Sequence, residues 1–204
     1  MSTINADTLS VKNLSVTGTL SYGNVTAQTA LPASPASGTI METLAGMCDG
    51  RSVTVHSGTY TLQNVTETQL APAAFADVTG SSISYKPPAG TSVVVYEFNF
   101  QHASVDAHGI TYFKMVIDGV DVNPSRFVSS GNPTHHQINF MQPLRIGVTE
   151  DTSNGDFATW TANKTISLQI QRHGASNEGE AHGQYYTTVF NTFRTPIIRI
   201  TAIA

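Results

Sequence analysis

The sequence predicts an all-β protein, an antiparallel jelly-roll β-sandwich preceded by an N-terminal segment of short β-strands, and three observations support this. Charged residues make up only 12% of the 204 residues, about half of the roughly 25% usual in globular proteins. Thr, Ser, Asn, Gln and Gly take their place, and Thr and Ser suit half-exposed strands better than helices. Short alternating apolar segments also recur between turn signals, and helical periodicity is limited to one possible turn at residues 41–47.

Residues 1–31 form the first predicted unit. Leu-Ser-Val occurs twice at an interval of five residues, and a turn at Lys12 and Asn13 would bring both copies onto one apolar face. Such short strands need neighbours from other chains, because an isolated ribbon is marginal in water. We therefore expect a homotrimer, and the residues expected to hold it together are Leu9, Val11, Leu14, Val16 and Leu20. An unstructured tail is the alternative for this segment.

The rest of the chain divides into a linker and a sandwich. Residues 32–50 are predicted to be a linker, because Pro, Ala, Ser and Gly dominate its first part. Residues 51–204 carry about eight or nine strand signals, which fit a two-sheet jelly roll. Residues 165–171 alternate between apolar and polar, as in an antiparallel sheet with one wet face. Asp118–Gly119 predicts a two-residue hairpin turn.

The most strongly apolar strand is predicted at residues 91–102. Four of its side chains should be mostly buried in a central strand: Val93, Val95, Phe98 and Phe100. Val95 and Phe98 have opposite parity, so they should face different layers.

Charge and cysteine content exclude several classes of protein. The net charge is −4 and no run of Lys or Arg occurs, whereas a nucleic-acid binder needs a cationic track along the phosphates. Cys48 is the only cysteine, so an internal disulfide is excluded and a small buried side chain is expected. The first residues lack the basic and apolar regions of a signal peptide, and no apolar run is long enough for a membrane span. We expect synthesis in a cytoplasm without membrane insertion.

The seven histidines were weighed as metal ligands. The groups considered are His102 with His108, His135 with His136, and His173 with His182. Adjacent histidines on a strand point to opposite faces, and the other pairs flank loops where hydrogen bonding is the simpler role. We therefore expect no metal site and no cofactor.

Catalytic patterns are also weak. The sequence has no Gly-x-Ser-x-Gly elbow, and its paired carboxylates fall in predicted turns, where acidic residues are common. We therefore expect that the protein is not an enzyme. A glycan hydrolase remains the alternative, since sequence does not reveal how far apart two carboxylates lie in space.

Binding surfaces are expected on loops and aromatic side chains. Residues 123–133 and 174–183 are long predicted loops on a rigid scaffold, where binding residues tend to lie. The candidate receptor contacts are Arg126, Asn177, Glu178, Glu180 and His182. The candidate sugar-stacking aromatics are Trp160, Tyr185 and Tyr186. A place in the core or in a subunit interface is the favoured interpretation of these aromatics.

Several segments resemble phage proteins. Residues 4–20 resemble the N-termini of phage virion proteins, tail fibres among them. Gly38–Leu44 with Cys48–Ser52 is similar to the start of phage tail-collar segments and then departs from that pattern. Residues 38–204 resemble small structural proteins of marine phages, especially cyanophages. The segments that carry this resemblance are Ala76–Gly90, Val95–Phe98, Ile117–Gly119 and Ile200–Ala204.

The resemblance implies a jelly-roll head, similar in plan to the trimer heads of the tumour-necrosis-factor type, on an N-terminal segment that anchors it to other virion proteins. The expected function is that of a virion structural protein, a trimeric fibre or spike that contacts the host surface, where a glycan is one candidate receptor. A capsid decoration protein that stabilises the shell and a carbohydrate-binding module are the alternatives. The expected location is the virion.

Overall fold

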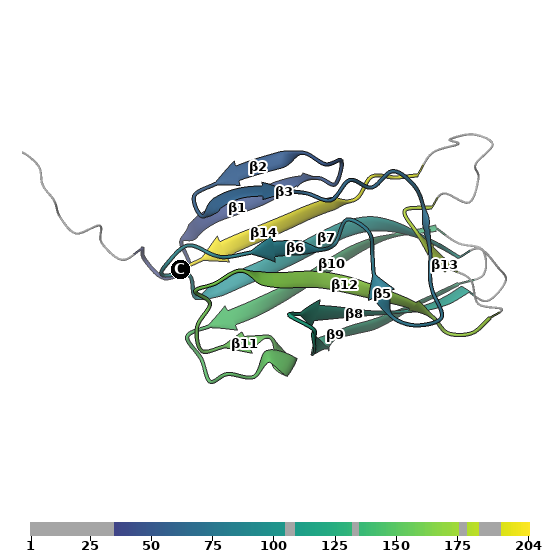
Figure 1. Cartoon of the computed structure of the whole chain (residues 1–204). Helices are drawn as coiled ribbons and strands as arrows, with labels where there is room; N and C mark the ends of the chain where they lie inside the picture. Colours follow the sequence, from purple (N-terminus) through teal and green to yellow (C-terminus); the bar gives the residue numbers. More distant parts are fainter. Residues whose placement is uncertain (1–34, 105–108, 132–134, 176–178, 184–192) are drawn as a thin grey trace, which may run out of the picture. The chain divides into compact units, whose positions relative to one another are not determined.

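The computed structural model describes residues 35–104, 109–131, 135–175, 179–183 and 193–204. In this part of the chain two β-sheets pack face to face (Figure 1), and the described helical structure is a single 3-10 turn, Thr152–Asn154. The prediction of an all-β sandwich is confirmed. The chain divides into two compact units, Met1–Ala33 and Ser34–Ala204, and the sandwich belongs to the second. The predicted strands of residues 1–31 lie outside the described residues.

The larger sheet has seven strands, and five of them lie in the order β1-β14-β7-β10-β11. The bounds are β1 Ile40–Met47, β14 Ile197–Ile203, β7 Val93–Ser104, β10 His135–Ile146 and β11 Asp156–Phe157. All pairs in this order are antiparallel except β10 with β11. Short β13 (Gly179–Ala181) pairs with β7 and with β4 (Gln69–Leu70), which completes the sheet.

The smaller sheet has five strands, and four of them lie in the order β5-β12-β8-β9. The bounds are β5 Ala76–Asp77, β12 Lys164–Arg172, β8 Gly109–Ile117 and β9 Val120–Gly131, and β6 (Ile83–Tyr85) also pairs with β12. Asp118 and Gly119 have positive φ values of 48° and 83° and form the tight turn between β8 and β9, as the sequence predicts. A separate hairpin joins β2 (Ser52–Val55) to β3 (Gly58–Thr61).

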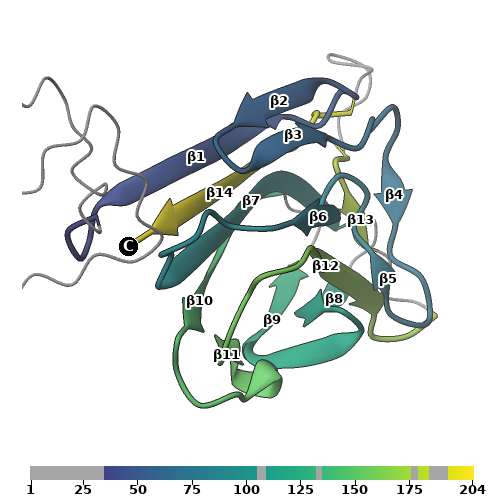
Figure 2. The same ribbon diagram turned by 60° about the vertical axis from the view of Figure 1, so that its left-hand side comes forward.

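The strand order identifies a jelly roll. If β5 and β6 are counted as one strand, the principal strands in chain order are β1, β5/β6, β7, β8, β9, β10, β12 and β14. The larger sheet then joins the first, eighth, third and sixth of these, and the smaller sheet joins the second, seventh, fourth and fifth. This alternation of the chain between two antiparallel sheets is the jelly-roll arrangement, and Figure 2 shows the two sheets facing each other.

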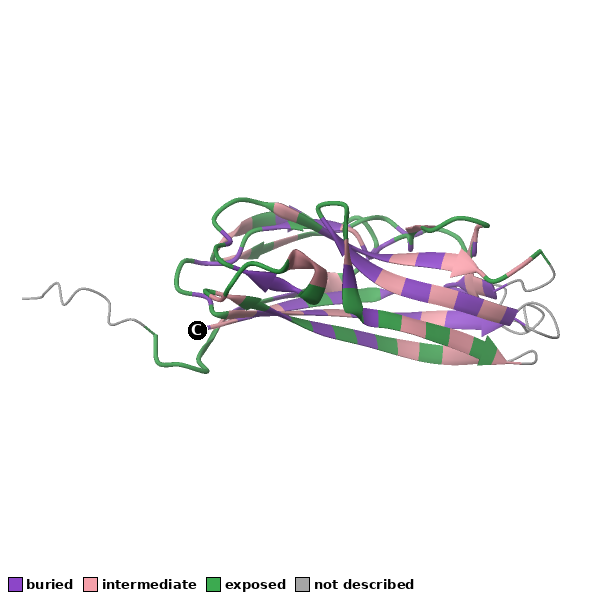
Figure 3. Ribbon diagram, turned by 90° about the horizontal axis from the view of Figure 1, so that it is seen from below, coloured by how far each residue is buried: buried purple, intermediate pink, exposed green. Residues whose placement is uncertain are grey.

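The core lies between the sheets, where alternate side chains of each long strand meet. The stripes of Figure 3 follow this alternation along the strands. In β7, which is central in the larger sheet, Phe98 and Phe100 are fully buried and stack on each other with ring centroids 5.2 Å apart. The prediction for these two residues is confirmed. Val93 and Val95 are half-buried, because they point to the opposite, outer face.

The predicted linker at residues 32–50 is wrong in its second half, since it contains β1. The expected helical turn at residues 41–47 is also a strand, because β1 pairs with β14 along its whole length. Leu44 fills the core, and the inward-facing carboxylate of Glu42 accepts hydrogen bonds from Ser57 and from the Tyr85 hydroxyl at 2.6 Å. The sandwich therefore begins before residue 51.

Candidate interaction surfaces

The outer side of the larger sheet is a broad surface, which we call the large-sheet face. Its residues alternate with the core residues of β1, β14, β7 and β10. They are Thr43, Ala45, Met47, Val93, Val95, Glu97, Asn99, Gln101, Gln137, Asn139, Met141, Pro143, Arg145, Ile197, Arg199, Thr201 and Ile203. Strand pairing places Thr43, Thr201, Val95 and Pro143 in one row across the four strands.

Large apolar side chains are exposed on this face. Met47 and Ile197 are neighbours on β1 and β14 and are each 42% exposed, and Met141 on β10 is 62% exposed. Val95 lies half-buried between Thr201 and Pro143. Met47 and Ile197 adjoin, and exposed apolar residues that adjoin one another are typical of a surface that contacts another molecule.

Charges on the large-sheet face are paired among the described residues. Glu97 and Arg199 are opposite each other on β7 and β14 and form a two-point ion pair. Arg145 binds Asp156 of β11 through two hydrogen bonds, of 2.7 and 2.5 Å. A surface with few unpaired charges loses little hydration when it is covered, as at the centre of protein–protein interfaces.

A group of amides continues the cross-strand row that begins with Met47 and Ile197. Asn99 donates to Asn139 across β7 and β10, and Gln137 donates to Asn99 at 2.7 Å. Arg194 donates to Gln137 at 2.8 Å. These groups satisfy one another, so the exposed apolar side chains remain the distinctive feature of the face.

Of the predicted receptor loop at residues 174–183, the described residues 179–183 lie at the end of the sandwich opposite Thr39 and Ala204, as the register of β7 with β13 and β14 requires. Part of it is not a loop, because Gly179–Ala181 form β13 within the larger sheet. Glu180 is half-buried in β13, and burial raises the pKa of its carboxyl. Asn177 and Glu178 lie outside the described residues.

His182 is fully buried, so its predicted role as a receptor contact is wrong. Pairing of β13 with β7 draws the following residue inward, and its imidazole packs edge-on against Phe98 and Phe100. Its Nε2 lies 2.9 Å from the Thr79 carbonyl oxygen. Burial lowers the pKa of His182 to about 4, which keeps the ring neutral.

The other predicted loop, residues 123–133, is largely strand, because β9 continues to Gly131. Arg126 is exposed as expected, but it projects from β9 and pairs with Asp121 at 3.0 Å. It is the one candidate receptor contact that the structure places both within the described residues and fully at the surface.

Trp160 is buried, which rules out the candidate role in stacking on a sugar and agrees with the core position that the sequence analysis favoured. Its indole packs on Phe157 and Tyr85, and its N–H donates to the Tyr85 carbonyl at 3.2 Å. A buried indole needs such a partner, and a core position provides it. Tyr185 and Tyr186, like Leu9, Val11, Leu14, Val16 and Leu20, lie outside the described residues.

The histidines and the cysteine have partners that fit structural roles. His102 is buried between the hydroxyls of Thr111 and Ser129, and burial lowers its pKa to about 4. His173 lies 2.5 Å from the Tyr112 hydroxyl. Cys48 is buried as predicted, and burial raises the pKa of its thiol to about 12.

Two further kinds of feature are absent from the described ranges. No three His, Cys, Asp or Glu side chains gather there in a way that would hold a metal ion. None of the helical structure in those ranges is long and apolar enough to span a membrane.

The large-sheet face was not identified from the sequence, although a signal for it exists. Residues 93–96 are apolar at both parities, and so are several positions of residues 197–203. A strand that is apolar on both sides is usually covered on both faces. Here one side is the core and the other is the large-sheet face.

No protein-family model matches the chain, and no curated protein matches it. Distant likenesses to solved structures include the CBM36-1 domain of a multidomain xylanase from the hindgut metagenome of Trinervitermes trinervoides. That match has 10% identity and a TM-score of 0.31, and it covers 78% of this chain and 96% of the other.

Two matches are to viral structures. The infectious bursal disease virus Gx strain matches with 14% identity and a TM-score of 0.33, over 79% of this chain and 36% of the viral chain. The VP2 subviral particle of the same virus matches with 12% identity and a TM-score of 0.28, over 80% and 37%. This chain thus spans little more than a third of the viral chains. Likenesses at such TM-scores assign no function.

Proposed function

We propose that this chain is a non-enzymatic structural protein of a virus particle, a trimeric fibre- or spike-like component whose jelly-roll head faces outward and attaches to the host surface. The resemblance of residues 4–20 and 38–204 to phage virion proteins supports a place in the virion. The resemblance in plan to trimer heads supports assembly of three copies. The N-terminal segment would join the head to other virion proteins.

The observation that carries the proposal is the large-sheet face. An uncovered surface of this kind exposes Met47, Met141 and Ile197 to water, and a second copy of the chain would cover them. The ion pair between Glu97 and Arg199 already neutralises the charges at its centre. Three copies that turn these faces toward a common axis would bury the exposed apolar side chains without leaving a charge unpaired.

Light scattering of the full-length protein at micromolar concentration tests the assembly. We expect a mass three times the 21.8 kDa of one chain. Val95→Glu places an unpaired charge in the middle row of the face and should reduce the mass to that of a monomer. Val120→Glu is the matched control, because Val120 is exposed on the smaller sheet and should leave the trimer intact. A monomeric full-length protein would refute the trimer.

Particles that carry Val95→Glu distinguish the attachment protein from the decoration protein. A fibre or spike that fails to trimerise should reduce adsorption to host cells while the shell keeps its resistance to heat. Fragile shells with normal adsorption would instead identify a capsid decoration protein and overturn the attachment role.

A further inference from the structure

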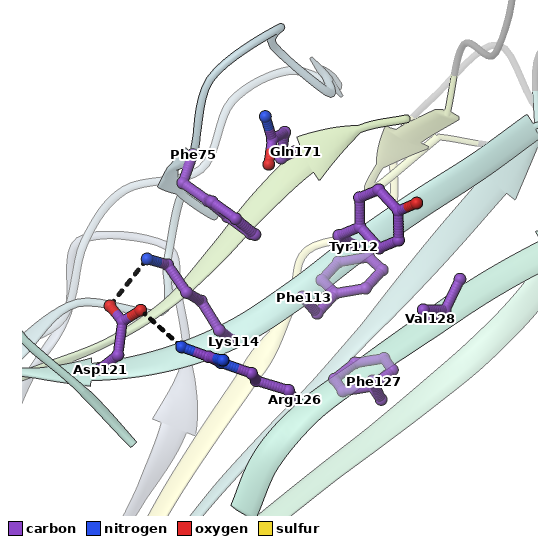
Figure 4. Close-up of a pocket in the computed structure, with 9 residues that line it drawn as sticks. All are labelled: Phe75, Tyr112, Phe113, Lys114, Asp121, Arg126, Phe127, Val128 and Gln171. Atoms are coloured by element: carbon purple, nitrogen blue, oxygen red, sulfur yellow. Dashed lines mark hydrogen bonds and ion pairs between the residues drawn. The ribbon is translucent and has the colours of Figure 1, made fainter. Parts of the chain in front are cut away.

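A groove lies on the outer side of the smaller sheet, away from the large-sheet face. It has a volume of about 430 Å³, within the roughly 300–1,000 Å³ of ligand pockets. Figure 4 shows side chains from β8, β9, β12 and the segment before β5 around it. The lining residues are Phe75, Tyr112, Phe113, Lys114, Asp121, Arg126, Phe127, Val128 and Gln171.

The groove is built by an irregularity in β9. Phe113 is paired with Phe127 and Met115 with Val122, so residues 123–126 stand opposite the single residue Lys114. The hydroxyl of Ser125 holds this excursion, because it accepts from the Met115 N–H at 2.7 Å and donates to the Val122 carbonyl at 2.5 Å. Bulges of this kind re-aim side chains, and here the bulge opens the sheet surface down to the Phe127 ring.

One side of the groove is aromatic. Phe75 is 37% exposed, and Tyr112 on β8 is half-buried. The Lys114 ammonium lies 4.3 Å from the centroid of the Phe75 ring, which holds that ring over the groove. At its base Phe127 stacks on Phe113, with ring centroids 4.7 Å apart and the planes 7° from parallel. The groove therefore has an aromatic base and an exposed ring at its rim.

The other side of the groove is polar and carries a net positive charge. The Asp121 carboxylate accepts from Lys114 at 2.7 Å and from Arg126 at 3.0 Å. Two cations thus share one anion, on a chain whose net charge is −4. The Arg126 side chain is 56% exposed. Its guanidinium has five N–H donors, and the pair with Asp121 leaves most of them available.

We infer that this groove binds one unit of an acidic glycan, a pyranose that carries a carboxylate. The C–H face of the sugar would lie on Phe75, and its hydroxyls would bond with the Gln171 amide. Its carboxylate would take the free edge of the Arg126 guanidinium, the group best suited to two-point carboxylate binding. The inference rests on the proposed attachment role, for which it supplies the receptor class.

The test uses full-length protein and two probes, a tetrasaccharide of galacturonic acid and its carboxyl-reduced neutral form. We expect saturation-transfer NMR to detect binding of the acidic probe, at least tenfold tighter than that of the neutral one. Arg126→Ala and Phe75→Ala should each weaken it at least tenfold. Arg51→Ala is the control, since Arg51 is also an exposed arginine, paired with Asp49 outside the groove, and should bind normally.

Each other result counts against the inference. Equal binding of both probes would refute the role of the carboxylate, and loss in Arg126→Ala but not in Phe75→Ala would indicate charge attraction without sugar stacking. Absence of binding at millimolar probe would overturn the site. A trimer that does not bind the probe would keep the structural role and refute the site. A monomer that binds the acidic probe would keep the site and refute the assembly.

Discussion

The two sheets have the same pleated geometry, but their outer surfaces differ. On the larger sheet, outward positions of β7 and β14 include the apolar residues Val95, Ile197 and Ile203. On the smaller sheet, the corresponding positions of β12 hold polar residues: Thr165 is exposed, Gln169 and Gln171 are half-buried, and the buried Ser167 donates to Asp77. The outer side of the larger sheet therefore favours contact with another apolar surface, whereas the polar positions of β12 favour hydrogen bonds and water.

This contrast teaches that the apolar pattern of a jelly roll does more than fill its core. Each sheet buries one of its sides against the other sheet, so a core needs only strands in which apolar and polar residues alternate. The larger sheet also has apolar residues at some outward positions, and the smaller sheet has a bulge in β9. Each departure marks a surface where contact with another molecule is proposed.

Acid pH should have the largest effect, because it acts at the end of the sandwich where the two sheets are joined. His102 of β7 lies 3.0 Å from Thr111 of β8, and His182 packs on β7 phenylalanines. Burial holds both pKa values at about 4 in the folded state, below about 6.5 in the unfolded chain. The contribution of these histidines to the free energy of unfolding should be fully present above about pH 6.5. It should fall as the pH approaches 4, by on the order of 3 kcal/mol for each histidine.

Urea unfolding at pH 7, 5.5 and 4 measures this loss. In the variant with both His102→Gln and His182→Gln, the loss between pH 6.5 and 4 should be much smaller, although the variant is less stable at pH 7. An unchanged pH profile in that variant would assign the acid sensitivity to other groups.

Phe98→Ala should have the next largest effect and lower the free energy of unfolding by about 3–5 kcal/mol at pH 7. The ring is fully buried and stacks on Phe100, so its removal leaves a cavity between the two sheets. Chemical denaturation measures the free energy of unfolding. Val128→Ala, at an exposed position of β9, should cost far less. A loss under about 1 kcal/mol for Phe98→Ala would mean that β7 is not the central strand.

Ser125→Ala should have the smallest effect, about 1–3 kcal/mol, because it leaves the buried N–H of Met115 without an acceptor. The bulge that distinguishes the smaller sheet should loosen, and binding in the groove should weaken with it. Ser130→Ala on the same strand is exposed and serves as the control. Equal stability of the two variants would show that the hydroxyl does not hold the bulge.

Local patterns were sufficient for much of the fold. Alternation in residues 165–171 predicted β12, and Asp118–Gly119 predicted the turn that joins β8 to β9. The same reasoning missed β1, because its flanking Pro, Ser and Gly residues are typical of a linker. Only pairing with β14, more than 150 residues along the chain, makes a strand of it.

The candidate sites show the same limit. Trp160 and His182 were chosen by residue type, which does not reveal burial, and both lie in the core. Arg126 was chosen as the only cation of its segment, and its exposure agrees with that choice. Its partners Phe75 and Gln171 come from distant parts of the chain, so the groove has no sequence motif.

By itself the sequence determined the all-β class, the two-sheet arrangement and the buried phenylalanines of β7, because side-chain alternation and turn chemistry act between near neighbours. Tertiary structure alone decided which strands pair, which side of β7 faces outward, and which polar side chains are buried. Those outcomes depend on contacts between residues far apart in the chain. Cross-strand register brings Glu97 to Arg199, 102 residues along the chain, and no local pattern specifies that pair.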